Sequence, residues 1–440
     1  MSTLTLRAVP HVDDSPRLPL LLPLLLAALF FAATHDPYAS HAWQTTVDGE
    51  VNDLVTRVAE GNPVRQVAFL LLGGLGVLGL CVPAARPFAP RPAVLVPLAL
   101  LVVWAGLSLG WSQTPGLTLK RLVVIGSVLA AATALVKHGT LTKLVETAFV
   151  TSGILLAVGV VVQLTMGPPY PGVTASRFAG TLHPNHAALN AALLLLSALV
   201  LSRRGRWFVL VALIAATALL LTRSRTALAA TIAAVGVMAV LRIPAGRFKW
   251  PVLVAAVVLS AGLALLAADA LPPVWQALLM GREESDVRTL TGRTDIWAFA
   301  LSRLDDPGRW LVGFGYDSFW SAERTAAVSA QSSFKISEGH SLYIDGVLEL
   351  GLIGLCLQAT AAGTAWLLYA RHARSTGVAE AGIAQAGPAA AGFAAAILAF
   401  AAVHGLAESA LNDAHLPTFF ALGVILHAAL FGAQISSEGR

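Results

Sequence analysis

Basic and imidazole side chains collect in a few short segments that adjoin long apolar runs. Arg293 lies in the segment GRTDIW at 292–297, and His340 directly precedes an apolar run that begins at residue 341. Arginine forks bind phosphate oxygens bidentately and stay charged, whereas a histidine can take up a proton near neutral pH. Together these residue types predict a site that stabilises a departing polyanion and activates an incoming hydroxyl.

The other candidate residues, apart from Glu349 within the run 341–370, lie at one end of an apolar run or in a polar segment between two runs. They are Arg225 as a further catalytic cation, and Arg177, Arg223, His183, Asn185, Glu349 and Arg288 as substrate-binding residues. Three or more guanidinium groups suit an anion with several oxygens. No cysteine or histidine spacing typical of a metal site occurs, so we expect no metal and no cofactor. Snorkelling of Arg223 and Arg225, and helix capping by Asn185 and His183, are the structural alternatives.

Two carboxylates follow His340 along the chain. Asp345 and Glu349 stand five and nine positions beyond it, so neither shares its helical face cleanly. Orienting the histidine is therefore not an obvious role for either of them. Because an unpaired carboxylate is costly inside a membrane, Glu349 is expected to pair with an arginine or to cap the interior of the site. Asp48 and Glu50 resemble a metal-binding acid pair, although solvated loop acids are the commoner explanation.

The composition identifies the elements that must position these residues. Hydrophobic residues make up 56% of the chain, charged residues 12%, and the mean hydropathy is +0.74. A soluble protein carries about twice that fraction of charge, so the sequence predicts an integral membrane protein. The net charge of +5 does not indicate nucleic-acid binding, because the basic residues lie in short loops where membrane topology explains them.

Apolar runs of spanning length, about 17–25 residues, can be placed twelve times, which predicts an all-α polytopic protein with a single membrane domain over 1–440. The runs are 18–34, 64–82, 93–110, 119–136, 144–166, 186–202, 207–222, 226–241, 250–270, 341–370, 386–404 and 416–433. The pair 207–222 and 226–241 could be one helix of about 35 residues, but that length exceeds a membrane span even with strong tilt. Two helices are therefore expected.

Charge predicts the orientation. With the N-terminus in the cytoplasm, inside segments hold fifteen Lys and Arg, and short outside segments hold seven. Both termini are then cytoplasmic, and a large polar loop at 271–340, between the ninth and tenth helices, lies outside. Sixteen of the 29 basic and 24 acidic residues fall in this loop. Arg177, Arg223 and Arg225 break the positive-inside rule at the same membrane face, as cations on a substrate path would.

These residues, in this order, resemble the O-antigen ligase and polymerase superfamily of polytopic glycosyltransferases. The resemblance is carried by Arg177-x-x-Gly180, His183-Pro184-Asn185, Ser224-Arg225, Gly292-Arg293-x-x-x-Trp297, Gly313-x-Gly315, His340, Glu349-x-Gly351-x-x-Gly354 and Glu408-Ser409-x-Leu411. It implies a GT-C-like fold in the bacterial inner membrane, with a periplasmic active site. The five runs before residue 177 match only in hydropathy.

The resemblance also implies a reaction. O-antigen linked to undecaprenyl diphosphate would be the donor and lipid A-core the acceptor, with membrane lipids around both. Transfer would invert the anomeric carbon and need neither nucleotide sugar nor metal. His340 would activate the acceptor, Arg225 and Arg293 would hold the diphosphate, and Arg177 would be a weaker third cation.

Subtypes of the superfamily differ in acceptor. A single large loop favours a ligase over an O-antigen polymerase, and an end about seven residues past the last apolar run favours it over a protein O-oligosaccharyltransferase. A transporter or flippase is the alternative from another class. It would place charge at mid-membrane in helices related by a repeat, whereas these ionisable residues collect at one face.

Overall fold

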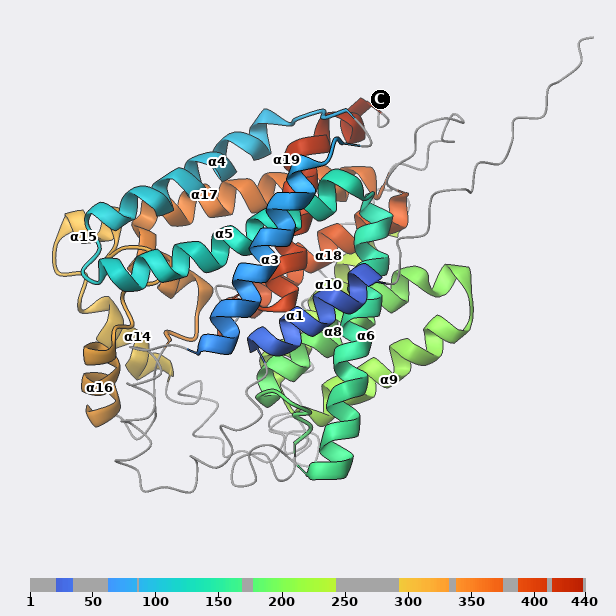
Figure 1. Ribbon diagram of the computed structural model, residues 1–440, viewed down its shortest axis with the longest axis horizontal. Helices are drawn as coiled ribbons and strands as arrows, with labels where there is room; N and C mark the ends of the chain where they lie inside the picture. The colour runs from blue at the N-terminus through green and yellow to red at the C-terminus, as the bar shows by residue number, and fades with distance from the viewer. Residues whose placement is uncertain are drawn as a thin grey trace, which may run out of the picture.

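The structure, a computed structural model, describes residues 21–34, 62–84, 87–167, 177–242, 293–331, 338–374, 387–409 and 414–437. Within these ranges all regular secondary structure is helical (Figure 1). Of the predicted polar loop, residues 293–331 and 338–340 are described. The predicted run 250–270 lies outside the described residues, as do Arg288, Asp48 and Glu50.

Seven helices in the described part of the chain are long and apolar enough to cross a membrane, which is consistent with a polytopic membrane protein. They are α3 (Pro63–Cys81), α4 (Pro92–Leu107) with the turn η2 (Ser108–Gly110), α5 (Pro115–His138), α6 (Leu141–Met166), α8 (Pro184–Leu201) with the turn η3 (Ser202–Arg204), α10 (Arg225–Arg242) and α17 (Leu342–His372). Four more apolar helices have described apolar stretches that are shorter: α1 (Leu21–Thr34), α9 (Trp207–Leu221), α18 (Pro388–His404) and α19 (Leu416–Ser437), of which the stretch is Leu416–Gly432. These eleven helices coincide with eleven of the predicted runs, and the count of twelve stays a prediction.

Helix α8 lies at the centre of the bundle and brings a polar segment to one end of it. Fourteen of its 18 residues are buried, many of them alanine, and it packs against α6, α9, α10 and α18. Small side chains let neighbouring helices approach closely. The helix begins at Pro184, where the Nδ1 atom of the N-cap His183 accepts a hydrogen bond from the amide of Asn185. The start of this largely buried helix is therefore polar.

The turn between α9 and α10 confirms that 207–222 and 226–241 are separate helices. Arg223 adopts the left-handed conformation with φ of 51°, which ends α9 and reverses the chain. The side chain of Arg177, which precedes α8, donates from Nε to the carbonyl of Thr222 at 2.7 Å. The start of α8 and the start of α10 thus lie at the same end of the bundle.

Helix α17 breaks at Gly351, whose φ of 66° is outside the helical range. The break leaves two carbonyls of α17 free to accept hydrogen bonds from the polar loop. The amide of Phe314 donates to the carbonyl of Leu348 at 2.8 Å, and the amide of Gly315 donates to the carbonyl of Glu349 at 2.9 Å. A Cβ atom at Gly351 would overlap the backbone of α15 (Pro307–Val312), so only glycine permits this approach. At this kink, the polar loop therefore packs against the membrane helices.

Two further helices of the polar loop are α14 (Arg293–Leu301), which packs against α17, and α16 (Ala322–Gln331). In Figure 1 they lie with α15 at one end of the bundle. A small apolar core joins α14 to the first half of α17, and consists of Ile296, Ala300, Leu304, Phe314, Phe319, Trp320, Val347 and Leu348. This core fixes the first turn of α14 beside the residues that precede α17.

Candidate active site

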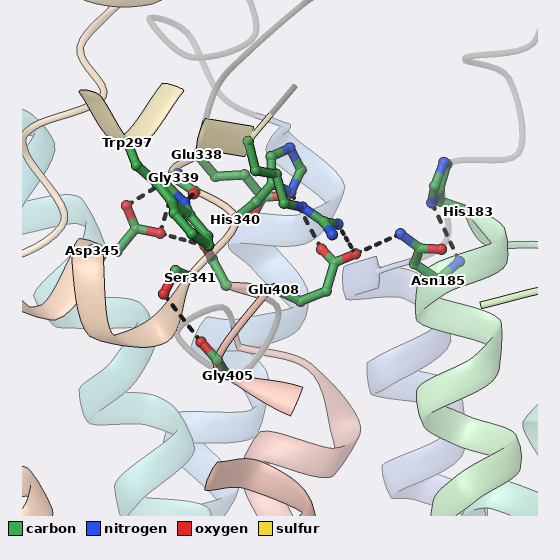
Figure 2. Close-up of polar contacts among 12 residues, drawn as sticks. His183, Asn185, Trp297, Glu338, Gly339, His340, Ser341, Asp345, Gly405 and Glu408 are labelled. Atoms are coloured by element: carbon green, nitrogen blue, oxygen red, sulfur yellow. Dashed lines mark hydrogen bonds and ion pairs between the residues drawn. The ribbon is translucent and has the colours of Figure 1, made fainter. Parts of the chain in front are cut away.

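Glu408, in the turn after α18, joins three segments that are far apart in the sequence. Its Oε1 atom accepts hydrogen bonds from Arg293 Nη2 at 2.5 Å and from Asn185 Nδ2 at 2.8 Å. Its Oε2 atom lies 3.3 Å from His340 Nδ1. Figure 2 shows Glu408 between the loop that carries His340 and the start of α8 that carries Asn185. The carboxylate is buried, with a side chain 5% exposed, so this polar cluster is held inside the protein.

His340 stands just outside α17, as the sequence predicts, in a strained backbone conformation. Its φ is 50°, one of three positive values among the described non-glycine residues. The Nδ1 atom also lies 3.3 Å from Glu338 Oε1, so two carboxylates face the same ring nitrogen. When Nδ1 donates its hydrogen to a carboxylate, Nε2 keeps its lone pair. The imidazole is 28% exposed, and its second nitrogen is thus suited to accept a proton.

The charges around His340 favour its protonated form. Burial alone lowers the pKa of His340, but the charge of Glu338 and the hydrogen bond and charge of Glu408 outweigh burial and raise it. For Glu408, burial alone would raise the pKa of the carboxyl. The hydrogen bond from His340 and the charge of Arg293 overcome burial and lower that pKa to about 2. Glu408 is therefore ionised at neutral pH, and stabilises positive charge on both neighbours.

Arg177 connects this cluster to the turn before α10. Its Nη2 atom donates to Asn185 Oδ1 at 3.0 Å, and the amide of Asn185 in turn binds Glu408. Arg177 and Asn185, both predicted to bind substrate, are here engaged with the protein itself. Their contacts connect the start of α8 and the α9–α10 turn to Glu408.

Asp345 contacts the residue that precedes His340, although its spacing from His340 gave it no obvious orienting role. Its buried carboxylate accepts from the amide of Gly339, at 3.1 Å for Oδ1 and 3.2 Å for Oδ2. Trp297 Nε1 donates to the carbonyl of Gly339 at 2.8 Å (Figure 2). Spacing on a helical face does not apply, because His340 precedes the helix and the side chain of Asp345 reaches back over its first turn.

The remaining predicted residues are not joined to Glu408 by the described contacts. Arg225 begins α10 and is half-buried, and Arg223 is exposed in the turn before it. Glu349 is buried deeper in α17, where its carboxylate accepts from the amide of Asp317. Roles for these residues in substrate binding stay predictions. His183 caps α8 beside Asn185, and its ring lies 6.1 Å from that of His186.

Three of the clustered residues are close enough in geometric terms to ligate a cation. One donor atom from each of Glu338, His340 and Glu408 lies within 4.8 Å of the others. However, Arg293 already supplies a positive charge 2.5 Å from Glu408. A cation bound there would face the repulsion of that guanidinium. The arrangement therefore fits a cluster of ion pairs that takes up and releases a proton, and it fits a metal centre less well.

Glu408 is the residue that the sequence-based prediction of the site left out. It was available only as part of the motif Glu408-Ser409-x-Leu411, with no chemical role attached. A local signal does exist, since a lone glutamate follows the apolar helix α18 directly, one turn after His404. Sequence spacing alone does not connect it with His340, 68 positions earlier.

Comparison with known proteins supports the resemblance over the central third of the chain. Residues 210–359 match the family model described as O-antigen ligase. The matched segment runs from α9 into α17, and so includes Arg225, Arg293 and His340 but neither Asn185 nor Glu408. None of the curated proteins compared with the chain matches it. Over residues 210–359, the chain is thus similar to the O-antigen ligase family.

Proposed function

We propose that the protein is an O-antigen ligase of the bacterial inner membrane. It transfers polysaccharide from undecaprenyl diphosphate to a sugar hydroxyl of lipid A-core at the periplasmic face, without a metal and with inversion. The observation that carries this proposal is the cluster in which Glu408 holds His340 beside Arg293. Glycosyl transfer from a diphosphate has two tasks: a base must activate the acceptor hydroxyl, and a cation must stabilise the departing diphosphate. A histidine and a guanidinium held by one carboxylate match these tasks. The family match over 210–359 supports the same chemistry.

His340 acts as the general base. Nε2 takes the proton from the acceptor hydroxyl while the acceptor oxygen attacks the anomeric carbon of the donor sugar. Glu338 and Glu408 face Nδ1 and stabilise the imidazolium that forms. An aspartate does the same for the histidine of serine proteases, although the reaction differs.

The departing diphosphate needs positive charge on the other side of the bond that breaks. The bond between the anomeric carbon and the diphosphate oxygen cleaves, and undecaprenyl diphosphate leaves with the electron pair. Arg293 binds Glu408 through Nη2, the one hydrogen bond it makes among the described residues, so Nε and Nη1 remain as donors to phosphate oxygens. Arg225 supplies a second cation, and Arg177 holds the turn that carries it.

A strain without the gene distinguishes the ligase from the polymerase of the same superfamily. A ligase deletion should accumulate lipid-linked polymer and leave the core unmodified, whereas single-repeat chains on the core would indicate a polymerase. Complementation with Arg293→Ala should fail, and Arg293→Lys should restore only part of the product, because lysine keeps the charge but loses the fork. Full complementation by Arg293→Ala would overturn the assignment of the diphosphate clamp.

A further inference from the structure

Asp345 binds the immediate neighbour of each member of the His340–Glu408 pair. Its carboxylate accepts from the amide of Gly339, which precedes His340, and from the hydroxyl of Ser409, which follows Glu408. Trp320 Nε1 donates to Oδ1 at 2.8 Å and completes the set of donors. The carboxylate is buried at 2% exposure, so its contacts are with protein groups and not with bulk water.

The peptide of Gly339 is held from both sides. Asp345 binds its amide, and Trp297 binds its carbonyl from α14. A Cβ atom at Gly339 would lie 2.4 Å from Asp345 Oδ1, so the approach requires glycine. The next residue, His340, has a φ of 50°, a strained conformation for a residue with a side chain. The hydrogen bonds of Asp345 and Trp297 to Gly339, together with that of Ser409 to Asp345, form a clamp that opposes relaxation of that strain.

The turn that carries Glu408 is tied to the same place by main-chain bonds. The carbonyl of Gly405 accepts from the amide of Leu342 at 2.9 Å and from Ser341 Oγ at 3.2 Å. These bonds set how close the end of α18 comes to the start of α17. The side chain of Asp345 then sets where the loop that carries His340 and the turn that carries Glu408 lie relative to these two helices. The carboxylate of Asp345, 64 positions before Ser409, thus bridges two loops that are far apart in the sequence.

We infer that Asp345 is a positioning residue for glycosyl transfer: with Ser409 and Trp297 it sets the separation of His340 from Glu408. The inference rests on the proposed function and extends it to residues that do not touch substrate. Displacement of a catalytic group by about 1 Å can cost about 100-fold in rate. A loosened clamp should therefore lower kcat and leave the KM for the lipid-linked donor unchanged.

Two variants loosen the clamp without changing any charge. Ser409→Ala removes the bond on the Glu408 side, and Trp297→Phe removes the bond on the Gly339 side. Trp111→Phe is the matched control, because it also removes one indole hydrogen bond to a carbonyl, that of Val312 at 3.2 Å. We expect Ser409→Ala and Trp297→Phe to lower kcat about tenfold or more, and the control to leave kcat unchanged. Equal kcat for all three variants and the wild type would overturn the inference.

A second measurement does not need transfer activity. Diethyl pyrocarbonate modifies unprotonated imidazole, so the rate of modification of His340 against pH, followed by mass spectrometry of its peptide, reports its protonation. Glu338, Glu408, Arg293 and Asp345 are the charged groups that act on His340. Loosened contact with Glu408 should shift the midpoint to lower pH in Ser409→Ala and Trp297→Phe, but not in Trp111→Phe.

The two readouts separate failure of the inference from failure of the proposed function. Wild-type protein without transfer activity would refute the proposed function, and the midpoint of His340 would still test the positioning. An unchanged midpoint in both clamp variants would refute the positioning even if the wild type transfers. Asp345→Asn removes a charge as well as two acceptor contacts, so it should shift the midpoint further than either variant.

Discussion

Replacing Glu408 with glutamine should destabilise the protein at neutral pH. The substitution keeps the size of the side chain but removes the negative charge shared by Arg293 and His340. Arg293 is 15% exposed, so its charge would be left without a counter-ion in a largely buried place. Removing one partner of a buried ion pair costs about 3–5 kcal/mol in general.

The pKa of Glu408 gives a second measure of this contribution. A pKa lowered from 4.5 to about 2 corresponds to about 3 kcal/mol in favour of the ionised form, at about 1.4 kcal/mol per pH unit. Because the folded-state pKa is depressed, this stabilisation is fully present above pH 4.5 and is lost as the pH falls toward 2. Wild type and Glu408→Gln should therefore differ by about 3 kcal/mol at pH 7 and converge in acid.

Unfolding of the purified protein in detergent, followed by tryptophan fluorescence at several pH values, measures this difference. Glu146→Gln is the matched control, since Glu146 also lies 2.5 Å from an arginine, Arg204. That pair is more open, with side chains 27% and 52% exposed, and exposed pairs contribute about 1 kcal/mol or less. The reasoning is refuted if Glu146→Gln costs as much as Glu408→Gln, or if the difference persists at pH 2.

Three further outcomes are expected. Since His340 must be unprotonated to act as a base, kcat should rise with pH. Glu338 raises the pKa of His340, so Glu338→Gln should move that rise to lower pH, and an unmoved pH profile of kcat would contradict the assignment. Gly351→Ala should destabilise the protein by about 1–3 kcal/mol, because φ is 66° and the new Cβ would overlap a carbonyl of α15. Gly363→Ala in the same helix meets open space and should not destabilise the protein, and thermal unfolding of the two variants compares them. A chelator should leave transfer unchanged, and loss of activity restored by a divalent cation would instead make the acidic cluster around His340 a metal site.

Hydropathy predicts most of the fold because the apolar runs have membrane length and are bounded by proline, glycine and charge. It also separates α9 from α10, since a single helix over 207–241 would exceed the membrane. The break in α17 is different in kind. Gly351 can be seen in the sequence, but its need for a positive φ arises from α15, which packs there from 40 positions earlier.

The site was predictable as a set of basic residues and a histidine, but not as a set of contacts. His340 and Arg293 were found because their residue types indicate chemistry on their own. Glu408 and Asp345 act through pairings over 68 and 64 positions that no local pattern records. Helical spacing gives Asp345 no obvious role beside His340, because it treats His340 as part of the helix, whereas the helix begins at Leu342.

The most direct test of the account is transfer by the wild type and by His340→Gln, purified in lipid nanodiscs with lipid-linked O-antigen and lipid A-core. Wild-type protein should form O-antigen joined to the core. His340→Gln should bind the donor with unchanged affinity and turn over about 100-fold more slowly or worse, as expected for loss of a general base. Turnover by His340→Gln at the wild-type rate would contradict the central claim.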